Sequence, residues 1–388
     1  MHAETGLRKI AAITTSRADY SHLHWVLRDL REHPDVDLRL IVTAAHLARG
    51  FGTVAEEIER DGHRIDERVE CLLDSDTDVG MAKTIGLATL GLADALGRIR
   101  PDLLLLIADR YEMLAPASVA LALRIPIAHI EGGEVSEGAI DDAVRNALTK
   151  LSHIHFAPTE RSERRILAMG EERWRVHRVG APSLDHLRRS EIPSRDELES
   201  ALDMRIERDA VVVAYHPVTL ARDTLGEVHE LFAALERIPG QILFCFPNAD
   251  AGSRELAHRI RSFCAGRQSA RLFVNLSPIH YWGLLRSAAL MIGNSSSGIM
   301  ETPTLGLPTI NVGTRQRGRE RARNILDAPA DREAILAAVG RGRDPDFQAS
   351  LAGMTNPYGD GRASGRIVEV LTGSPLGEQL LYKRADSA

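Results

Sequence analysis

The sequence predicts an α/β protein made of two Rossmann-like domains that face a central cleft. Two observations carry this prediction: short, nearly unbroken apolar runs alternate with amphipathic segments, and the whole alternation restarts near the middle of the chain. Unbroken apolar runs are typical of strands covered on both faces, and their alternation with helices indicates a parallel sheet. The length of 388 residues also suits two domains of ordinary size.

The first half alternates predicted strands with predicted helices. Strands are expected at Lys9–Thr15, Leu38–Thr43, Leu103–Ala108, Ile125–Ile130, Ile154–Ala157 and Val176–Val179. Helices are expected at Leu23–Glu32, Val54–Asp61, Met81–Ile99 and Met113–Leu123. This order is typical of a doubly wound sheet, so we expect an N-terminal domain over residues 1–187.

A polar connector, Pro193–Ser200, separates the halves and contains a helix start at Ser194. It is followed by strands expected at Ala210–Tyr215, Gln241–Phe246, Leu272–Val274, Leu290–Ile292 and Thr309–Val312. They predict a second Rossmann-like domain over residues 188–373 and a surface tail over residues 374–388. A ligand is expected between the domains, at the carboxyl ends of the strands.

Composition and charge argue against several classes of protein. The formal net charge of −6 provides no basic field, so we expect no nucleic-acid partner. Cys71, Cys245 and Cys264 are too few and too widely spaced for a disulfide framework or a zinc site. The N-terminus lacks the pattern of a signal peptide, and the longest apolar run, Leu103–Ala108, is too short to cross a bilayer. We therefore expect a cytoplasmic protein without a membrane partner.

The best candidate for a phosphate site is Gly293–Gly298, a Ser/Gly-rich segment between a predicted strand and a helical run over Ile299–Leu305. Glycines allow a phosphate to approach the backbone, and Ser295 and Ser296 add hydroxyl donors. Taken alone, the segment favours the simpler interpretation of a turn that caps a helix. Glu301, in the following helix, either accepts from ribose hydroxyls or complements the helix dipole. Neither a Gly-x-Gly-x-x-Gly segment after the first strand nor a Walker A loop is present, which argues against nicotinamide and P-loop chemistry.

Three carboxylates stand out in the first half. Asp109 and Glu131 each end a buried run, and parallel strands end at the same edge of a sheet, so both are expected to face one cleft. Asp141 and Arg145 share a helix face. Carboxylates crowded into one cleft raise each other's pKa, which suits proton transfer near neutral pH. Each one alone is more often a helix cap or a solvated charge.

Further polar residues follow other predicted strands. Ser16–Tyr20 either begins a helix capped by Asp19 or directs Arg17 into the cleft. His216 and Asn248 follow two strands of the second half and are selected as nucleotide contacts. His216 either reaches a phosphate or is merely structural. A basic stretch follows the last strong strand, and it is either a solvated loop or a source of one or two guanidinium groups for a diphosphate. Its arginines are Arg315, Arg317, Arg319, Arg321 and Arg323, of which we select Arg317.

These segments, in this order and spacing over about residues 8–370, resemble a known family. The chain is similar to the hydrolysing UDP-N-acetylglucosamine 2-epimerases that make N-acetylmannosamine for sialic acid, in bacteria and in the epimerase half of the bifunctional animal enzyme. Glu131-Gly-Gly-Glu134 favours this branch, since non-hydrolysing relatives typically carry Glu-Ala-Gly-Leu there. The motifs that carry the resemblance are Ser16–Tyr20, Asp109–Glu112, His129–Glu134, Ile140–Asp142, Thr149–Ser152, His216–Thr219, Phe246–Gly252, Gly293–Gly298 and Gly313–Arg319.

The resemblance implies a fold and a reaction. The fold is the two-domain GT-B type, which one large class of glycosyltransferases also has. In the reaction, a base removes the C2 proton of the sugar as UDP leaves C1, which gives a 2-acetamidoglycal. Water then adds across the double bond with inversion at C2. No metal or other cofactor is required, because hydroxyls, backbone amides and guanidinium groups stabilise the leaving diphosphate.

The resemblance also implies roles for individual residues. Asp109, Glu131 and Asp141 match the active-site acids, with their separate roles left open, and Arg145 matches an active-site arginine. The nucleotide-binding positions fall on Arg17, His216, Asn248, Ser295, Ser296, Glu301 and Arg317. Relatives form dimers or tetramers, so a homodimer or homotetramer is expected.

Two departures from the family pattern concern the substrate. Ala108 replaces the glycine that usually precedes Asp109, and Asn146 replaces a histidine. They leave open whether the sugar is N-acetylglucosamine or a 2,4-diacetamido-6-deoxy sugar, and whether the nucleotide is UDP or GDP. Two alternative functions remain, a glycosyltransferase that uses a UDP-sugar donor and a UDP-sugar sensor without activity. A glycosyltransferase does not need three proton-handling acids, and a sensor would bind the UDP-sugar without changing it.

Overall fold

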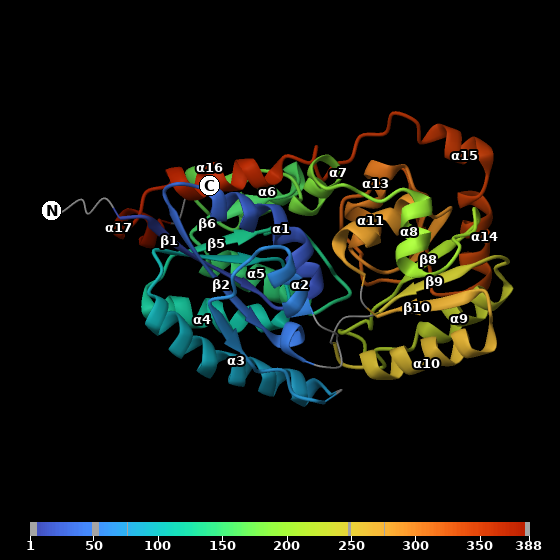
Figure 1. Cartoon of the computed structure of the whole chain (residues 1–388), viewed down its shortest axis with the longest axis horizontal. Coiled ribbons are helices and arrows are strands. Elements are labelled where there is room, and N and C mark those ends of the chain that lie inside the picture. The colour runs from blue at the N-terminus through green and yellow to red at the C-terminus, as the bar shows by residue number, and fades with distance from the viewer. Residues whose placement is uncertain (1–5, 49–53, 76, 247–249, 275, 385–388) are drawn as a thin grey trace.

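The protein consists of two α/β lobes that face each other (Figure 1). The computed structural model describes residues 6–48, 54–75, 77–246, 250–274 and 276–384. Each lobe contains one parallel sheet with helices on both sides, which confirms the predicted fold class.

The N-terminal sheet has seven parallel strands in the order β3-β2-β1-β4-β5-β6-β7. All residues of β4 are buried, as expected for a strand between two layers of helices. β3 was not predicted, because it is a three-residue edge strand that pairs with β2 and carries two charged residues. The strands are β1 (Arg8–Thr14), β2 (Val36–Thr43), β3 (Glu67–Val69), β4 (Leu103–Ile107), β5 (Ile127–Ile130), β6 (Ile154–Ala157) and β7 (Val176–Arg178).

The first helix of this lobe starts earlier than its apolar pattern indicates. Ser16 is the N-cap, because its Oγ accepts from the N–H of Asp19 at 3.3 Å, while Asp19 accepts from the N–H of Thr15 at 3.1 Å. Asp19 therefore lies inside the helix and is not its cap. The helices are α1 (Arg17–Glu32), α2 (Val54–Arg60), α3 (Asp78–Ile99), α4 (Leu114–Leu123), α5 (Asp141–Leu151), α6 (Glu160–Ala168) and α7 (His186–Arg189).

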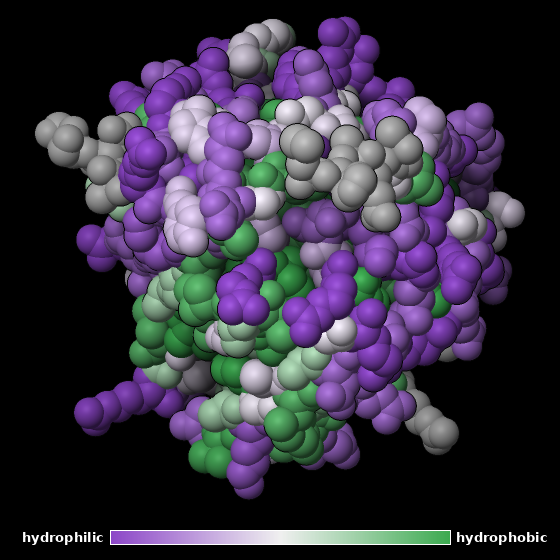
Figure 2. All heavy atoms as spheres, turned by 90° about the vertical axis from the view of Figure 1, so that its left-hand side faces the viewer, coloured by the Kyte–Doolittle hydropathy of each residue, from purple (hydrophilic) through white to green (hydrophobic). Residues whose placement is uncertain are grey.

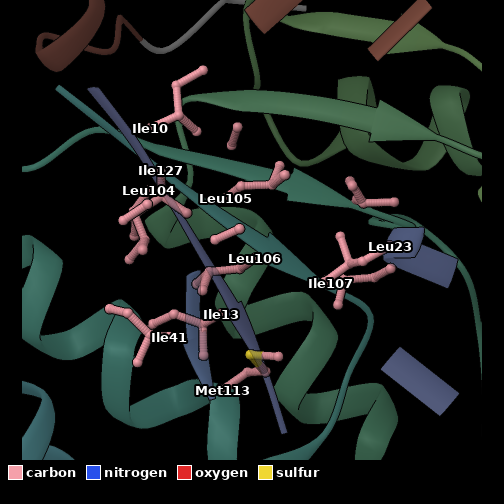
Figure 3. Close-up of a cluster of buried hydrophobic side chains, with 14 of the residues drawn as sticks. Ile10, Ile13, Leu23, Ile41, Leu104, Leu105, Leu106, Ile107, Met113 and Ile127 are labelled. Carbon is pink, nitrogen blue, oxygen red and sulfur yellow. The ribbon is translucent and has the colours of Figure 1, made fainter. Parts of the chain in front are cut away.

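Aliphatic side chains from β1, β4 and the flanking helices form the core of this lobe (Figure 3). Ile10, Ile13, Leu23 and Leu104–Ile107 are fully buried. Burying one such side chain contributes about 1.5–3 kcal/mol. This packing fixes the carboxyl ends of β1 and β4, which carry the polar residues described below.

The C-terminal lobe contains a six-stranded parallel sheet in the order β10-β9-β8-β11-β12-β13. β13 was not predicted, because it is a short edge strand whose apolar run is interrupted by the exposed Asp327. The helical run expected over Ile299–Leu305 is two short helices, since Pro303 has no N–H for the helix ladder. The strands are β8 (Val211–Ala214), β9 (Ile242–Cys245), β10 (Ala270–Phe273), β11 (Leu290–Gly293), β12 (Thr309–Val312) and β13 (Ile325–Ala328). The helices are α8 (Arg195–Leu202), α9 (Val228–Arg237), α10 (Ser253–Gly266), α11 (Pro278–Ser287), α12 (Ser297–Met300), α13 (Thr302–Leu305), α14 (Arg332–Gly342) and α15 (Pro345–Ser350).

The C-terminal segment returns to the N-terminal lobe. α16 (Ala363–Gly373) and α17 (Glu378–Leu381) place Ile367, Leu371 and Leu380 in the core of that lobe, and Figure 1 shows α16 lying along it. The predicted end of the second domain at residue 373 and the predicted surface position of the tail after it are therefore corrected. From Ala363 onward the described chain belongs to the first lobe, because α16 buries its apolar face there.

The cleft forms where the strand order of each sheet reverses. This point lies between β1 and β4 in the first sheet and between β8 and β11 in the second. Strand connections diverge on either side of such a point, which leaves a crevice at the carboxyl ends of the strands. Residues that follow these strands line one cleft between the lobes, among them Arg17, Asp109, His216 and Ser295.

The far end of the N-terminal lobe carries an extended hydrophobic area (Figure 2). On α3 and α4, Leu87, Leu90 and Leu121 are 42%, 70% and 59% exposed. Among the described residues, α3 is the one helix long and apolar enough to cross a bilayer. Length and composition alone do not separate a membrane span from a core helix, and α3 packs against α4 and β3 with Leu92 and Leu96 fully buried.

Candidate active site

Most of the residues selected from the sequence line the same cleft. They are Arg17, Asp109, Glu131, Asp141, Arg145, His216, Ser295, Ser296 and Glu301. Asn248 lies outside the described residues. Arg317 lies on the surface, as described below.

Unusual backbone angles bring two of the acids into the cleft. Ala108 and Glu131 adopt left-handed conformations with φ of 56° and 65°. Both positions follow a strand, and the N–H groups of Ala108 and Glu131 donate to Ile130 and Phe156 at 2.9 Å, so the sheet holds these turns in place. A left-handed non-glycine residue costs about 1–2 kcal/mol, and such conformations concentrate at functional sites. The turns direct Asp109 and Glu131 out of the sheet.

Asp109 lies beside two guanidinium groups. Nη2 of Arg145 donates to Oδ2 of Asp109 and, at 3.1 Å, to Oγ of Ser136. Nη2 of Arg319, from the opposite lobe, lies 3.9 Å from the same carboxylate oxygen. Arg145 is fully buried on α5, one helical turn after Asp141. These contacts fix the orientation of the Asp109 side chain.

Glu131 forms an ion pair with a residue that was not selected from the sequence. Nδ1 of His22 lies 2.7 Å from Oε1 of Glu131. Burial alone raises the pKa of Glu131, but the charge and hydrogen bond of His22 outweigh it, and the pKa falls below its usual value. Burial lowers the pKa of His22, but Glu131 and then Glu301 raise it to about 9. Near neutral pH the pair is therefore carboxylate and imidazolium.

Asp141, at the start of α5, faces the C-terminal lobe. Its Oδ2 accepts from Nη2 of Arg315 at 3.1 Å. Burial raises the pKa of Asp141 above its usual value, although Arg315 acts in the opposite direction. Glu131 and Asp141 thus have pKa values displaced in opposite directions. Such a pair suits one group that accepts a proton and another that donates one.

A buried ion pair joins the lobes next to these acids. Nη1 of Arg110 donates to Oδ1 of Asp250 at 2.7 Å, and Nη2 donates to Oε1 of Glu112 at 3.0 Å. Burial raises the pKa of Asp250, but Arg110 and Arg315 outweigh it and keep the pKa below its usual value. Asp250 lies within the motif segment Phe246–Gly252. Its partner Arg110 lies within another motif segment, Asp109–Glu112, which follows β4.

In the C-terminal lobe, Gly293 and Asn294 position His216. Gly293 has a φ of 147°, and a Cβ there would lie 1.9 Å from the carbonyl oxygen of Ala214, so the position requires glycine. The Asn294 side chain accepts from the N–H of His216 at 2.7 Å and donates to its carbonyl oxygen at 2.8 Å. Burial, followed by the nearby charge of Arg315, lowers the pKa of His216 to about 3. The imidazole is therefore neutral near pH 7 and carries a single N–H.

The Ser-rich segment lies next to a buried carboxylate. Ser295 and Ser296 are half-buried in the cleft wall. Oγ of Ser297 donates to Oε2 of Glu301 at 2.6 Å, and the Tyr281 hydroxyl lies 2.5 Å from the same Oγ. Burial raises the pKa of Glu301, with His22 acting against it. Hydroxyl groups and a carboxyl group thus lie together in this wall of the cleft.

Arg317, the arginine selected from the basic stretch, lies outside the cleft. The Arg317 side chain is 75% exposed and pairs with Glu137 at 3.1 Å. Arg315 and Arg319 instead line the cleft, with side chains 9% and 6% exposed. The loop after β12 turns between Arg315 and Gly318, so that Arg315 and Arg319 enter the cleft while Arg317 points away from it. The even spacing of the arginines in the sequence does not reveal this difference.

The sequence contained a signal that His22 belongs to the site. It lies three residues after Asp19 and four after Ala18, and all three line the cleft. Residues at these spacings share one face of a helix. Because Arg17 was expected in the cleft at the start of a helix, His22, just over one turn further along that helix, could also have been expected there.

The arrangement brings cationic side chains together with carboxyl groups. Arg17, Arg145, Arg315 and Arg319 bring positive charge into a largely buried cleft, where electrostatic interactions are strong. The Arg17 guanidinium also donates to the carbonyl oxygen of Val274 at 2.6 Å, so it contacts both lobes. Among the described residues, no group of three or more His, Cys, Asp and Glu side chains is arranged to hold a metal ion.

Comparisons with known proteins identify relatives of this chain. The family model described as UDP-N-acetylglucosamine 2-epimerase matches residues 28–372. A GDP/UDP-N,N'-diacetylbacillosamine 2-epimerase (hydrolyzing) of Campylobacter jejuni is 36% identical over 83% of this chain and 84% of its own. A UDP-N,N'-diacetylbacillosamine 2-epimerase (hydrolyzing) of Legionella pneumophila is 35% identical over 97% of this chain and 99% of its own. The crystal structure of UDP-GlcNAc 2-epimerase from Neisseria meningitidis bound to UDP-GlcNAc matches with a TM-score of 0.76 and 19% identity, and covers 94% of this chain and 99% of that one.

Proposed function

The chain belongs to the UDP-N-acetylglucosamine 2-epimerase family, and from this premise we propose that it is a hydrolysing 2-epimerase of a UDP-linked 2-acetamido sugar. It would release UDP and the free 2-epimeric sugar. The observation that carries the proposal is the common cleft of Asp109, Glu131 and Asp141 with Ser295 and Glu301. Proton-handling groups at the sugar and anion-binding groups at the nucleotide are the two requirements of this reaction.

In the first step, Glu131 serves as the base. Its carboxylate takes the C2 proton, the C2–H electron pair becomes the C1=C2 double bond, and the C1–O bond to the diphosphate breaks. UDP leaves with the electron pair of the broken C1–O bond. The low pKa of Glu131 beside His22 supports this assignment, because the group is ionised near neutral pH.

In the second step, water adds across the C1=C2 bond of the 2-acetamidoglycal. The water oxygen bonds to C1 and its proton passes to a carboxylate, for which Asp109 is our candidate. C2 takes a proton from Asp141 on the face opposite to the one that lost it, which inverts C2. The raised pKa of Asp141 supports its role as the proton donor. The balance is sugar nucleotide plus water giving UDP plus free sugar.

The nucleotide is held by the C-terminal lobe in this proposal. Ser295, Ser296 and His216 donate to the diphosphate, and Glu301 accepts from the ribose hydroxyls. Arg315 and Arg319 neutralise the charge that develops on the leaving group. Their burial supports this role, since guanidinium groups in a largely buried site stabilise charge more strongly than exposed ones.

For the sugar, two candidates follow from the relatives. They are N-acetylglucosamine, giving N-acetylmannosamine, and N,N'-diacetylbacillosamine, a 2,4-diacetamido-6-deoxy sugar. The second is favoured by the names of the Campylobacter and Legionella relatives, and the first by the ligand of the Neisseria structure. Assays with UDP-N-acetylglucosamine and with UDP- and GDP-N,N'-diacetylbacillosamine decide between them. The preferred substrate is the one with the highest kcat/KM.

The reaction itself is tested in heavy water without an acceptor. We expect each molecule of UDP released to be matched by one molecule of the free 2-epimer that carries deuterium at C2, measured by NMR and mass spectrometry. UDP release without deuterium at C2 would instead indicate a glycosyltransferase acting on water. Calorimetric binding of the sugar nucleotide with no turnover over hours would indicate a sensor.

We further propose that the enzyme is a homo-oligomer assembled through α3 and α4. Leu87, Leu90 and Leu121 are exposed there, and neither residues 84–93 of α3 nor the whole of α4 include a charged side chain. Two copies of such a neutral apolar surface meet without charge repulsion, which suits a two-fold interface. Light scattering should give a multiple of 42.6 kDa, and Leu90→Glu should lower the measured mass to one chain.

A cytoplasmic location is also part of the proposal. The three cysteines are free, as expected in a reducing compartment. Fractionation of cells should recover the protein with cytoplasmic markers, and recovery with membranes would contradict this.

A further inference from the structure

His22 occupies a position between the two halves of the cleft. It projects from α1 in the N-terminal lobe, and its side chain is 16% exposed. Nδ1 lies 2.7 Å from Oε1 of Glu131, while Nε2 lies 3.8 Å from Oε1 of Glu301 in the C-terminal lobe. One imidazole thus contacts the carboxylate assigned to the sugar and approaches the one assigned to the ribose.

The charged groups around His22 are mainly acidic. Glu131 faces it from the end of β5, Glu301 from between α12 and α13, and Asp19 from its own helix. His186, from α7, is a further titratable group whose charge interacts with it. Three carboxylates around one imidazole favour the imidazolium form, with both ring nitrogens as donors.

We propose that His22 is a positioning residue that acts through Glu131, keeping this carboxylate ionised and oriented while its other ring nitrogen links Glu131 to the nucleotide site at Glu301. The inference rests on the proposed function, since it concerns how the base of that reaction is prepared. His22 keeps its own protons throughout: the C2 proton moves to Glu131, and no bond forms at the imidazole.

The two contacts of the ring couple the halves of the reaction. When ribose hydroxyls donate to Glu301, they share its negative charge, and its attraction for Nε2 of His22 becomes weaker. The imidazolium then interacts mainly with Glu131. Coupling of this kind is reciprocal, so the protonation state of the His22–Glu131 pair must also change the affinity for UDP.

The first test does not require enzymatic activity. The His22 imidazole is titrated by NMR in the wild type and in Glu131→Gln, with the resonance assigned by its loss in His22→Gln. We expect the pKa of His22 to fall by at least about one unit in Glu131→Gln, because the amide carries no charge. Glu171→Gln, which changes a carboxylate bonded to His155 and not to His22, is the matched control and should leave the resonance unchanged. An unchanged titration in Glu131→Gln would overturn the proposal.

The second test uses the pH profile of kcat. Removing the cation in His22→Gln lets the pKa of Glu131 rise, so the acid limb should move toward higher pH by about one unit, with KM changed less than about threefold. His22→Lys restores a cation and should restore the acid limb, even where kcat is reduced. Equal losses in both variants with an unmoved acid limb would show a merely structural role and overturn the proposal.

The two tests separate this inference from the proposed function. A wild-type enzyme inactive on every sugar nucleotide assayed would refute the proposed function, and the NMR titration would still decide whether His22 and Glu131 act as a pair. Thermal unfolding of each variant checks that the fold is retained.

Discussion

Nη1 of Arg110 in the N-terminal lobe lies 2.7 Å from Oδ1 of Asp250 in the C-terminal lobe, and both side chains are buried. A second carboxylate, Glu112, accepts from the same guanidinium. The two lobes are therefore joined beside the cleft by an ion pair whose members belong to different lobes. A change at this pair should affect both the stability of the contact between the lobes and the alignment of Asp109, the neighbour of Arg110.

Removing one partner of this pair should be costly. In Arg110→Met, Glu112 and Asp250 remain buried without a counter-charge, and we expect the free energy of unfolding to fall by about 3–5 kcal/mol in urea titrations. Arg28→Met is the matched control, because the Arg28–Glu32 pair is more than half exposed, and it should cost less than about 1 kcal/mol. Similar losses in the two variants would contradict a special role for the buried pair.

Asp109 should be needed for chemistry and not for nucleotide binding. We expect Asp109→Asn to bind UDP within about threefold of the wild type by calorimetry, while kcat falls by about 10²–10⁴. The reason is that the amide keeps the shape of the side chain but accepts no proton. Unchanged turnover would remove Asp109 from the reaction.

The basic loop after β12 offers a direct comparison of two arginines. Arg319→Gln should lower kcat/KM for the sugar nucleotide by about 10²-fold, because it removes a buried charge near Asp109. Arg317→Gln should change kcat/KM less than about twofold, since the side chain is exposed and pairs with Glu137. Steady-state assays of both variants check this, and the reverse ranking would restore the selection made from the sequence.

The left-handed conformation of Ala108 predicts opposite effects of two substitutions. Ala108→Gly should leave the stability unchanged or raise it by up to about 1 kcal/mol, because glycine adopts a φ of 56° without strain. Ala108→Val should lower it by at least about 1 kcal/mol, since a β-branched residue is strongly disfavoured there. Thermal unfolding of the pair is the measurement, and equal stabilities would contradict the observed backbone angle.

Glu171 should make the attachment of the C-terminus sensitive to acid. Burial raises the pKa of this carboxyl, but hydrogen bonds from His155, Lys150 and Lys383 outweigh it and lower the pKa to about 2. Because the folded pKa lies below the unfolded value of about 4.3, the contribution to stability is complete above about pH 5 and is lost as the pH falls toward about 2.

Urea unfolding of the wild type and Glu171→Gln at several pH values measures this contribution. The difference in stability should be largest near about pH 6 and should shrink steadily below the ordinary carboxyl pKa of about 4.3. A difference that is independent of pH would show that the ionised form of Glu171 does not carry it.

Several elements of the molecule followed from local pattern alone. β1 and β4 were evident as apolar runs, because strands between two layers of helices bury their side chains: all five of β4 and those from Ile10 onward in β1. Ser194 marked the start of α8, where a capping box satisfies the first N–H groups of the helix. Asp109 and Glu131 were expected at one edge because parallel strands all end on the same side.

The sequence by itself determined the two-lobed α/β fold, the alternation of strands and helices, and the position of the acids at the ends of strands. These properties depend on neighbours along the chain, and hydrophobic periodicity reports such neighbours directly. Only the tertiary structure decided which arginines of the basic loop enter the cleft, that His22 pairs with Glu131, and that α16 returns to the first lobe. These depend on contacts between segments distant in sequence, whose energies come from burial and charge pairing that no local pattern records.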